Sequence, residues 1–289
     1  MRPWSKYHAL GNDYLVVEAA AWADWLHAAA IRRVCDRHLG IGADGVMVRE
    51  ADEGPGRFRA RILNPDGSEA EKSGNGLRIF ARHLWDTGGV GPEAFEVSTP
   101  GGCVTCRVLS GGAEVEAAIG RASFDSRTIP VAGPPREVLR EHLVADGRTL
   151  EFSAATLGNP HCVLLRDDVS EAEARRLGPL VEKDARFPHR TNVQFARVVD
   201  RANLELRIWE RGAGYTLASG TSSAAAAAVA RRLGLCDASV IAHMPGGKLA
   251  LEIGPDFAVS LRGPVVKVAE GMLHDEALAG VAGSEAPEE

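Results

Sequence analysis

Two short segments of this chain share one local pattern, and the repetition predicts a duplicated fold. Ser73-Gly74-Asn75-Gly76 and Ser219-Gly220-Thr221-Ser222 each place a hydroxyl residue, a glycine and a small polar residue at the start of an apolar helical run. The first turn of a helix carries unpaired backbone N–H groups and the positive end of its dipole, so it attracts anions. Two such starts predict two related halves that hold an acidic ligand between them.

Each serine also has a purely structural explanation, because serine is a preferred N-cap residue. For either serine alone that role is the more common one, and only the repetition favours a functional role. Neither lies in a G-x-S-x-G elbow, since Glu71 and Leu217 stand where the first glycine is needed. A Ser-His-Asp hydrolase is therefore poorly supported.

Length and charge narrow the classes of partner. A chain of 289 residues can form one large domain or two domains of about 140 residues. The net charge of -6 argues against a broad nucleic-acid surface. No apolar run reaches about 18 residues and no signal-peptide pattern opens the chain, so we expect no membrane partner and a cytoplasmic location.

The cysteines predict neither disulfides nor a metal site. They are five in number and scattered, at Cys35, Cys103, Cys106, Cys162 and Cys236, which is typical of reduced thiols. Cys103 and Cys106 lie in an alternating stretch, where positions i and i+3 of a strand point to opposite faces. With no nucleotide-binding loop or pyridoxal-lysine motif either, we predict no metal and no cofactor.

The predicted elements follow the same order twice. An outer helix (22–38), strands and the first Ser-Gly helix precede further strands; a helix near 170–183, strands and the second Ser-Gly helix (220–233) do the same. The alanine run 224–228 fits either simple helix propensity or a helix threaded through a curled sheet, and we favour the second. We predict an N-terminal half of residues 1–121 plus 267–289 and a C-terminal half of residues 122–266.

Several polar residues could bind an amino acid. Four asparagines at the ends of predicted strands could each be simple turn residues, but as a set they offer neutral donors and acceptors for an ammonium and a carboxylate: Asn12, Asn64, Asn159 and Asn192. Glu210 and Arg211 form either an exposed ion pair of little energetic value or a clamp for a zwitterion. His161 is equally consistent with a core imidazole and with a proton-handling group.

The chain resembles the diaminopimelate epimerase family, which comprises cofactor-independent amino acid isomerases of the proline racemase-like superfamily. The resemblance spans nearly the whole chain. It rests on eight motifs in the family's order: His8-Ala9-Leu10-Gly11-Asn12-Asp13, Gly42-Ala43-Asp44-Gly45, Asn64-Pro65-Asp66-Gly67-Ser68, Gly74-Asn75-Gly76 with Arg78, Gly158-Asn159-Pro160-His161, Thr191-Asn192-Val193, Glu210-Arg211-Gly212 and Gly220-Thr221.

The resemblance implies an α/β fold of the α+β kind, with two pseudo-symmetric domains, each a curled, mostly antiparallel sheet wrapped around a central helix. It implies a small-molecule amino acid substrate between the halves and a homodimer. Positions matching the family's contacts to the distal end of the substrate are Asn64, Asn159, Asn192, Glu210 and Arg211, and Asn12 matches another substrate contact. Positions matching its contacts to the reacting carboxylate are Gly74, Asn75, Gly220 and Thr221.

The chain departs from the family at the two proton-transfer positions, where the family's catalytic cysteines are replaced by Ser73 and Ser219. A thiol has a pKa of about 8.5, lowered further at a helix N-terminus, whereas an alcohol is a far weaker acid. Because α-proton removal needs a base poised near the working pH, we expect epimerisation to be slow or absent unless His161 or Glu210, which match the family's assisting groups, activates the serines. Nearby residues are also unusual for the family: Lys72, Tyr215, Ser222 and Ser223.

The resemblance therefore predicts an isomerase that interconverts LL- and meso-diaminopimelate by proton transfer at Cα, on the route to lysine and peptidoglycan. The catalytic residues would be Ser73, Ser219, His161 and Glu210. Two alternatives remain open. One is a divergent isomerase or lyase acting on another amino acid, and the other is a catalytically silent protein that binds an amino acid.

Overall fold

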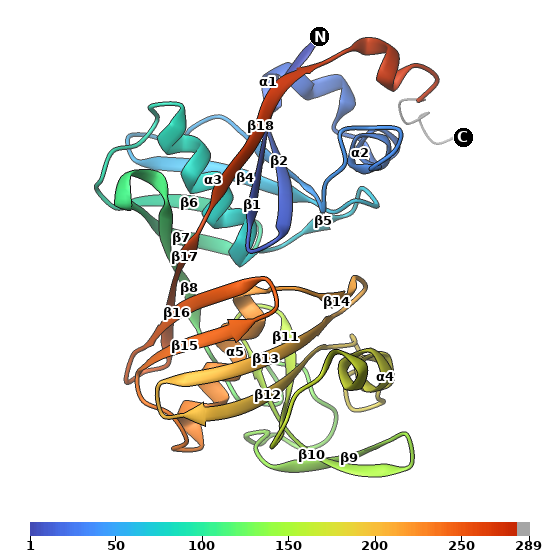
Figure 1. Ribbon diagram of the computed structural model, residues 1–289, viewed down its shortest axis with the longest axis vertical. Helices are drawn as coiled ribbons and strands as arrows, with labels where there is room; N and C mark the ends of the chain where they lie inside the picture. The colour runs from blue at the N-terminus through green and yellow to red at the C-terminus, as the bar shows by residue number, and fades with distance from the viewer. Residues whose placement is uncertain (282–289) are drawn as a thin grey trace. The chain divides into compact units, whose positions relative to one another are not determined.

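The computed structural model describes residues 1–281 and separates the chain into two compact units (Figure 1). Unit 1 comprises Met1–Ala117 and Pro264–Glu289, and unit 2 comprises Ala118–Gly263. Residues 282–289, at the end of the predicted N-terminal half, lie outside the described residues. Unit 1 is thus built from both ends of the sequence, and unit 2 from one continuous segment.

Unit 1 is a mostly antiparallel sheet. Its strands are β1 (Arg2–Ala9), β2 (Asn12–Glu18), β3 (Val46–Arg49), β4 (Arg57–Leu63), β5 (Glu69–Ala70), β6 (Phe95–Thr99), β7 (Gly102–Leu109), β18 (Val266–Leu273) and β8 (Glu114–Arg121), which continues into unit 2. The alternation of charged and apolar residues in β4 buries Phe58, Ala60 and Ile62 on one face, as expected for a half-buried strand. Two contacts are parallel, β2 with β3 and β4 with β6.

Unit 2 repeats this pairing pattern strand for strand. Its strands are β9 (Glu141–Ala145), β10 (Arg148–Thr156), β11 (Pro160–Leu165), β12 (Asn192–Asp200), β13 (Asn203–Glu210), β14 (Gly214–Thr216), β15 (Ser239–Met244), β16 (Gly247–Ile253) and β17 (Ala258–Pro264). The parallel contacts here are β11 with β12 and β13 with β15. Parallel neighbours need a crossover connection, and in both units a helix supplies it at the same two places.

The first crossover in each unit is a helix that packs on the outside of the sheet. In unit 2 it is α4 (Glu171–Glu182), whose Leu177 and Val181 join the cluster around Phe195. In unit 1 the predicted helix over 22–38 is wrong as a single element, because it divides into α1 (Ala19–Trp22), a 3-10 turn (Ala23–Trp25) and α2 (Ala28–Cys35). His27 adopts an extended backbone and its ring accepts a hydrogen bond from Ala30 N, so a new helix starts there.

The second crossover in each unit is a central helix, α3 (Gly74–Asp86) or α5 (Gly220–Arg232). Helix α3 packs against β1, β2 and β7, and α5 packs against β10, β11, β12 and β16. All five alanines of the run 224–228 are at most 1% exposed, which confirms the threaded-helix interpretation. Methyl side chains let the sheet approach α5 from every side. Two further 3-10 turns are Ser110–Gly112 and Asp275–Leu278.

Candidate active site

Ser73 forms the N-cap of α3. Its backbone is extended, and its Oγ accepts a hydrogen bond of 3.0 Å from Gly76 N. A Cβ at Gly76 would lie 2.8 Å from Met47 Sδ and 3.2 Å from Ser73 Oγ, so a larger residue here would crowd both the methionine and the cap. The sequence therefore builds this helix start with a hydroxyl that is already oriented by the backbone.

A chain of side-chain amides runs away from the start of α3. Asn75 Nδ2 donates to Asn12 Oδ1 at 3.1 Å, and Asn12 Nδ2 donates to Asp44 Oδ2 at 3.0 Å. At the other end, Arg78 Nη2 donates to Asn75 Oδ1 at 3.0 Å. Since each end fixes which amide atom accepts, both asparagine side chains have one defined orientation. The structure thus joins Asn12 and Asn75, which lie far apart in the sequence.

A buried cation flanks one end of this amide chain, and a pair of carboxylates flanks the other. Arg78 is fully buried, and burial lowers its pKa to about 10, so it stays protonated at neutral pH beside the positive end of α3. Burial also opposes ionisation of Asp13, but hydrogen bonds from Arg37 and Lys6 outweigh it and hold the pKa of Asp13 at about 2. Arg37 Nη2 bridges Asp13 Oδ1 at 2.6 Å and Asp44 Oδ1 at 2.8 Å. These pairs hold the loop that carries Asp44.

Asn64 is held by a turn of its own. Its backbone N donates to Ser68 O at 2.8 Å, and its Nδ2 donates to Ser68 Oγ at 2.9 Å. Gly67 closes the turn at a φ of +86°, where a Cβ would lie 2.3 Å from Ala28 Cα. The Nδ2 group of Asn64 therefore donates within the turn, apart from the chain that links Asn75 and Asn12.

Sequence reasoning missed Tyr14. Its hydroxyl lies 3.4 Å from Ser73 Oγ, and the residue is 7% exposed. A Cβ at Gly45 would lie 2.6 Å from Cε1 of Tyr14, so the glycine leaves room for the ring. The sequence does hold one indication of this contact. Asn12 and Tyr14 are two residues apart on β2, and because side chains alternate along a strand, both lie on the same face of the sheet.

In unit 2, Ser219 forms the N-cap of α5. Its Oγ accepts a hydrogen bond of 3.4 Å from Ser222 N, and its carbonyl oxygen accepts one of 2.7 Å from Ser223 Oγ. Ser222 and Ser223 are fully buried, while Thr221 is 7% exposed. The Ser223 hydroxyl and the Ser222 backbone N thus both bond the N-cap residue of α5 from inside the unit.

His161 is a buried, neutral imidazole. Its Nδ1 lies 3.1 Å from Gln194 Nε2, an amide donor, and its Nε2 lies 2.9 Å from Asn159 Oδ1, so these assignments place the proton on Nε2. Burial, followed by the charge of Arg211, lowers its pKa to about 3. Gln194 Nε2 also donates to Ser222 Oγ at 3.0 Å, which connects the imidazole to α5. Sequence reasoning missed this glutamine.

Asn192 and Arg211 lie beside His161. The parallel pairing of β11 and β12 puts His161 opposite Asn192, whose Nδ2 donates to Pro160 O at 2.9 Å. Asn192 Oδ1 accepts from Arg211 N at 2.9 Å. The structure therefore brings together four predicted residues of unit 2: Asn159, His161, Asn192 and Arg211.

Glu182 fixes the segment that carries Glu210 and Arg211, and the sequence analysis did not single it out. Glu182 is 4% exposed; its Oε2 accepts from Trp209 Nε1 at 2.7 Å, and its Oε1 accepts from Gly212 N at 3.2 Å. Glu210, the last residue of β13, is thereby held between two anchored neighbours. A buried carboxylate on an outer helix carries no sequence signal of this role.

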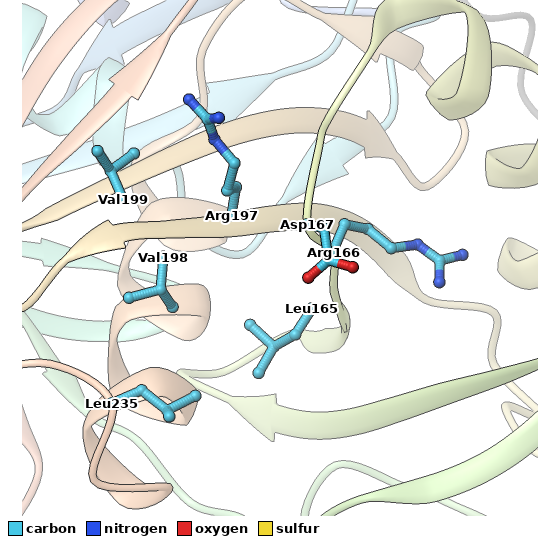
Figure 2. A pocket seen from close by; sticks show the side chains of 7 residues that line it. All are labelled: Leu165, Arg166, Asp167, Arg197, Val198, Val199 and Leu235. Atoms are coloured by element: carbon cyan, nitrogen blue, oxygen red, sulfur yellow. The ribbon is translucent and has the colours of Figure 1, made fainter.

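A cavity of about 500 Å³ in unit 2 is unrelated to these residues. Figure 2 shows its lining: Leu165, Arg166, Asp167, Arg197, Val198, Val199 and Leu235. Leu235 follows the C-terminal end of α5, whereas Ser219 precedes its first residue, and 13 helical residues span about 20 Å. In the part of the chain that the structure describes, no group of three or more His, Cys, Asp or Glu residues could hold a metal, and no helix could span a membrane.

Comparison with known proteins gives the family. The family model for diaminopimelate epimerase matches residues 4–124 and 153–268. Diaminopimelate epimerase 2 of Nostoc sp. is 50% identical over 274 residues, covering 95% of this chain and 96% of that protein. Diaminopimelate epimerase of Moorella thermoacetica is 41% identical over 273 residues, covering 92% and 97%.

Solved structures show the same fold at lower identity. A probable proline racemase from Agrobacterium radiobacter superposes with a TM-score of 0.73 at 14% identity, covering 99% of this chain and 96% of that chain. A predicted epimerase from Pseudomonas aeruginosa gives a TM-score of 0.69 at 20% identity, covering 94% and 99%. The predicted two-domain α/β fold is confirmed, and with the sequence matches it places the chain in the diaminopimelate epimerase family.

Proposed function

We propose that this protein epimerises diaminopimelate at an α-carbon without a cofactor, interconverting the LL and meso isomers. Its supporting observation is the 50% identity to a diaminopimelate epimerase over 95% of the chain. Two serine-capped central helices, one in each unit, supply the proton-transfer positions that such a reaction needs. Each of these helices starts with N–H groups suited to a carboxylate.

The residues divide into three roles. Ser73 and Ser219 take the proton-transfer positions, with His161 and Glu210 as assisting groups. The backbone at Gly74, Asn75, Gly220 and Thr221 binds the reacting carboxylate, and the helix dipoles stabilise the negative charge that develops there when the α-proton leaves. The distal amino acid end is bound by Asn64, Asn159, Asn192, Glu210 and Arg211, with Asn12 as a further contact.

The reaction moves one proton off the α-carbon to one cap oxygen, and the other cap hydroxyl delivers a proton to the opposite face. Nothing else is gained or lost, so the chemistry depends on how readily an oxygen can accept the α-proton. A neutral His161 with a pKa of about 3 is a weak proton acceptor at neutral pH. Its connection to α5 through Gln194 and Ser222 suits it better to orienting the helix start.

Deuterium incorporation tests the proposal. The protein is incubated with LL-diaminopimelate in deuterated water, and α-deuterium and the meso isomer are followed by mass spectrometry and chiral chromatography. We expect both products, slowly with the wild-type serines and faster in the double variant S73C/S219C, because a thiolate forms far more readily than an alkoxide. Absence of deuterium incorporation in the double variant, with its fold intact, would refute the substrate assignment.

We also propose a homodimer and a cytoplasmic location, as the family resemblance and the sequence predict. The dimer is supported by β18, which pairs with β1 and exposes three large apolar side chains, Val266, Val268 and Met272. Sedimentation velocity of the wild type and of V268E gives the test: a dimer that V268E weakens supports this surface, and a wild-type monomer at micromolar concentration refutes the dimer.

A further inference from the structure

Two buried phenols on neighbouring strands reach opposite ends of α3. Tyr7 on β1 and Tyr14 on β2 are directly paired in the sheet. The Tyr7 hydroxyl donates to Asp86 Oδ2 at 3.1 Å, at the C-terminal end of the helix. The Tyr14 hydroxyl lies 3.4 Å from Ser73 Oγ, at its N-terminal end. Only the second phenol therefore meets a proposed proton-transfer group.

The hydrogen-bonding capacity of Ser73 decides what this contact can do. A serine hydroxyl has one proton and two lone pairs, and Gly76 N already occupies one lone pair. Ser73 keeps its own proton and one lone pair for two further partners. Tyr14 can take that proton, which leaves the remaining lone pair of Ser73 for a substrate proton. A separation of 3.4 Å is long, but catalytic hydrogen bonds often shorten only when substrate is bound.

We propose that Tyr14 is a positioning residue that relays a proton through Ser73, an inference that rests on the function proposed above. With the phenol ionised, Ser73 Oγ forms a bond to the α-proton as the C–H bond breaks, and the Ser73 proton passes to the Tyr14 oxygen. The phenolate is neutralised and the negative charge moves to the α-carbon and its carboxylate. The reverse transfer returns the proton to carbon and restores the phenolate.

This relay answers the chemical difficulty of the serines. A lone alcohol must become an alkoxide, whereas in the relay the proton finally resides on a phenol, which is a stronger acid than an alcohol. Proton transfer is faster when the pKa of the acid–base group lies closer to the working pH. A well-placed group of this kind contributes a rate factor of about 100-fold or more. Tyr14 thus supplies an acid–base group for Ser73 within unit 1, whereas the sequence alone suggested His161 or Glu210 as the activating groups.

Several charged and titratable groups lie on the elements around β2. They are Tyr7 on β1, Asp13 on β2 itself, Asp44 just before β3, and Lys72 and Arg78 at the start of α3. Burial lowers the pKa of Lys72, and Arg78 is a buried cation. Asp13 and Asp44 are both paired with Arg37.

The test compares Y14F in two backgrounds over a range of pH. With Ser73 in place, we expect α-deuterium exchange with diaminopimelate to rise toward alkaline pH, and Y14F to lower it by about 100-fold and abolish the rise. In the S73C background, we expect Y14F to change the rate little, because a thiolate needs no phenol. Y7F is the matched control, since it removes the other phenol hydroxyl facing α3, and it should leave the exchange unchanged.

Each other outcome counts against the relay. An equal loss from Y14F in both backgrounds would show a structural role, and no loss with Ser73 present would show no role. Wild-type exchange absent at every pH, with S73C/S219C active, would overturn the relay but keep the substrate assignment. Absence of exchange in an intact S73C/S219C protein would overturn the proposed function and the relay with it. Circular dichroism of every variant confirms the fold.

Discussion

Arg78 Nη2 donates to Asn75 Oδ1 across 3.0 Å within the first turn of α3, and both side chains are buried. The guanidinium therefore fixes the side chain of a residue whose backbone the proposed function assigns to the reacting carboxylate. Because Asn75 in turn donates to Asn12, one buried cation orders two of the predicted contacts. A residue that touches no substrate can thus determine how well substrate binds.

We expect R78M to weaken binding of diaminopimelate by about tenfold, equivalent to about 1.4 kcal/mol, because Asn75 loses the donor that orients it. Isothermal titration calorimetry measures this affinity. R82M is the control, since Arg82 lies on the same helix but pairs with Asp86 at its other end. Equal losses from R78M and R82M would indicate a general effect on α3, and unchanged affinity in R78M would contradict the orienting role.

The buried His161 predicts a loss of stability in acid. Its folded pKa of about 3 lies below the ordinary 6.5, so the unfolded chain binds a proton that the folded chain does not. Its stabilising contribution is complete above about pH 6.5 and is lost as the pH falls toward 3. Urea denaturation at pH 7.5 and pH 5 should show a smaller pH effect in H161Q than in the wild type. The exposed His189 provides the control H189Q, and an equal pH effect in H161Q and H189Q would contradict the prediction.

Gly67 should be far less tolerant of substitution than Gly88, although both have a positive φ. G88A adds a Cβ that meets nothing within 4 Å, so only backbone strain of about 1–2 kcal/mol is expected. G67A adds the same strain and places its Cβ 2.3 Å from Ala28 Cα, which must displace the turn around Asn64. Thermal unfolding should show the larger loss in G67A. Equal losses would mean that the turn moves away without cost.

The alanine-rich helix should resist enlargement. A226L puts three additional carbons on α5 at a position 1% exposed, and overpacking of this kind costs about 1–3 kcal/mol. A172L on the exposed face of α4 adds the same atoms and should change stability little. The free energies of unfolding of A226L and A172L, measured by urea denaturation, test this difference. A stability for A226L equal to that of A172L would show that space remains around α5.

Sequence reasoning succeeded where the signal was local or repeated. The two Ser-Gly helix starts, the alternation in β4 and the alanine run of α5 each follow from spacing and side-chain size, and the structure has all three elements. It failed at the helix over 22–38, because its apolar periodicity continues through His27, where a side-chain cap restarts the helix.

The relations inside the candidate site were harder to predict. Asn12 and Asn75 were each singled out, but their hydrogen bond joins residues 63 positions apart, and nothing in the sequence encodes that pairing. Gln194 and Tyr14 were missed because each looks like an ordinary strand residue. Their roles arise only when β12 lies beside β11 and β2 lies against α3.

The pairing of β1 with β18 has a consequence for synthesis on the ribosome. Arg2 pairs with Leu273 and His8 pairs with Val266. One edge of β1, the first strand synthesised, is therefore covered only when β18, the last strand, has been made. Unit 2 is continuous and is fully translated while β1 still lacks this neighbour. Unit 2 can therefore be completed before unit 1 during synthesis. A stop codon before Val266 would release a protein in which β1 lacks its β18 neighbour.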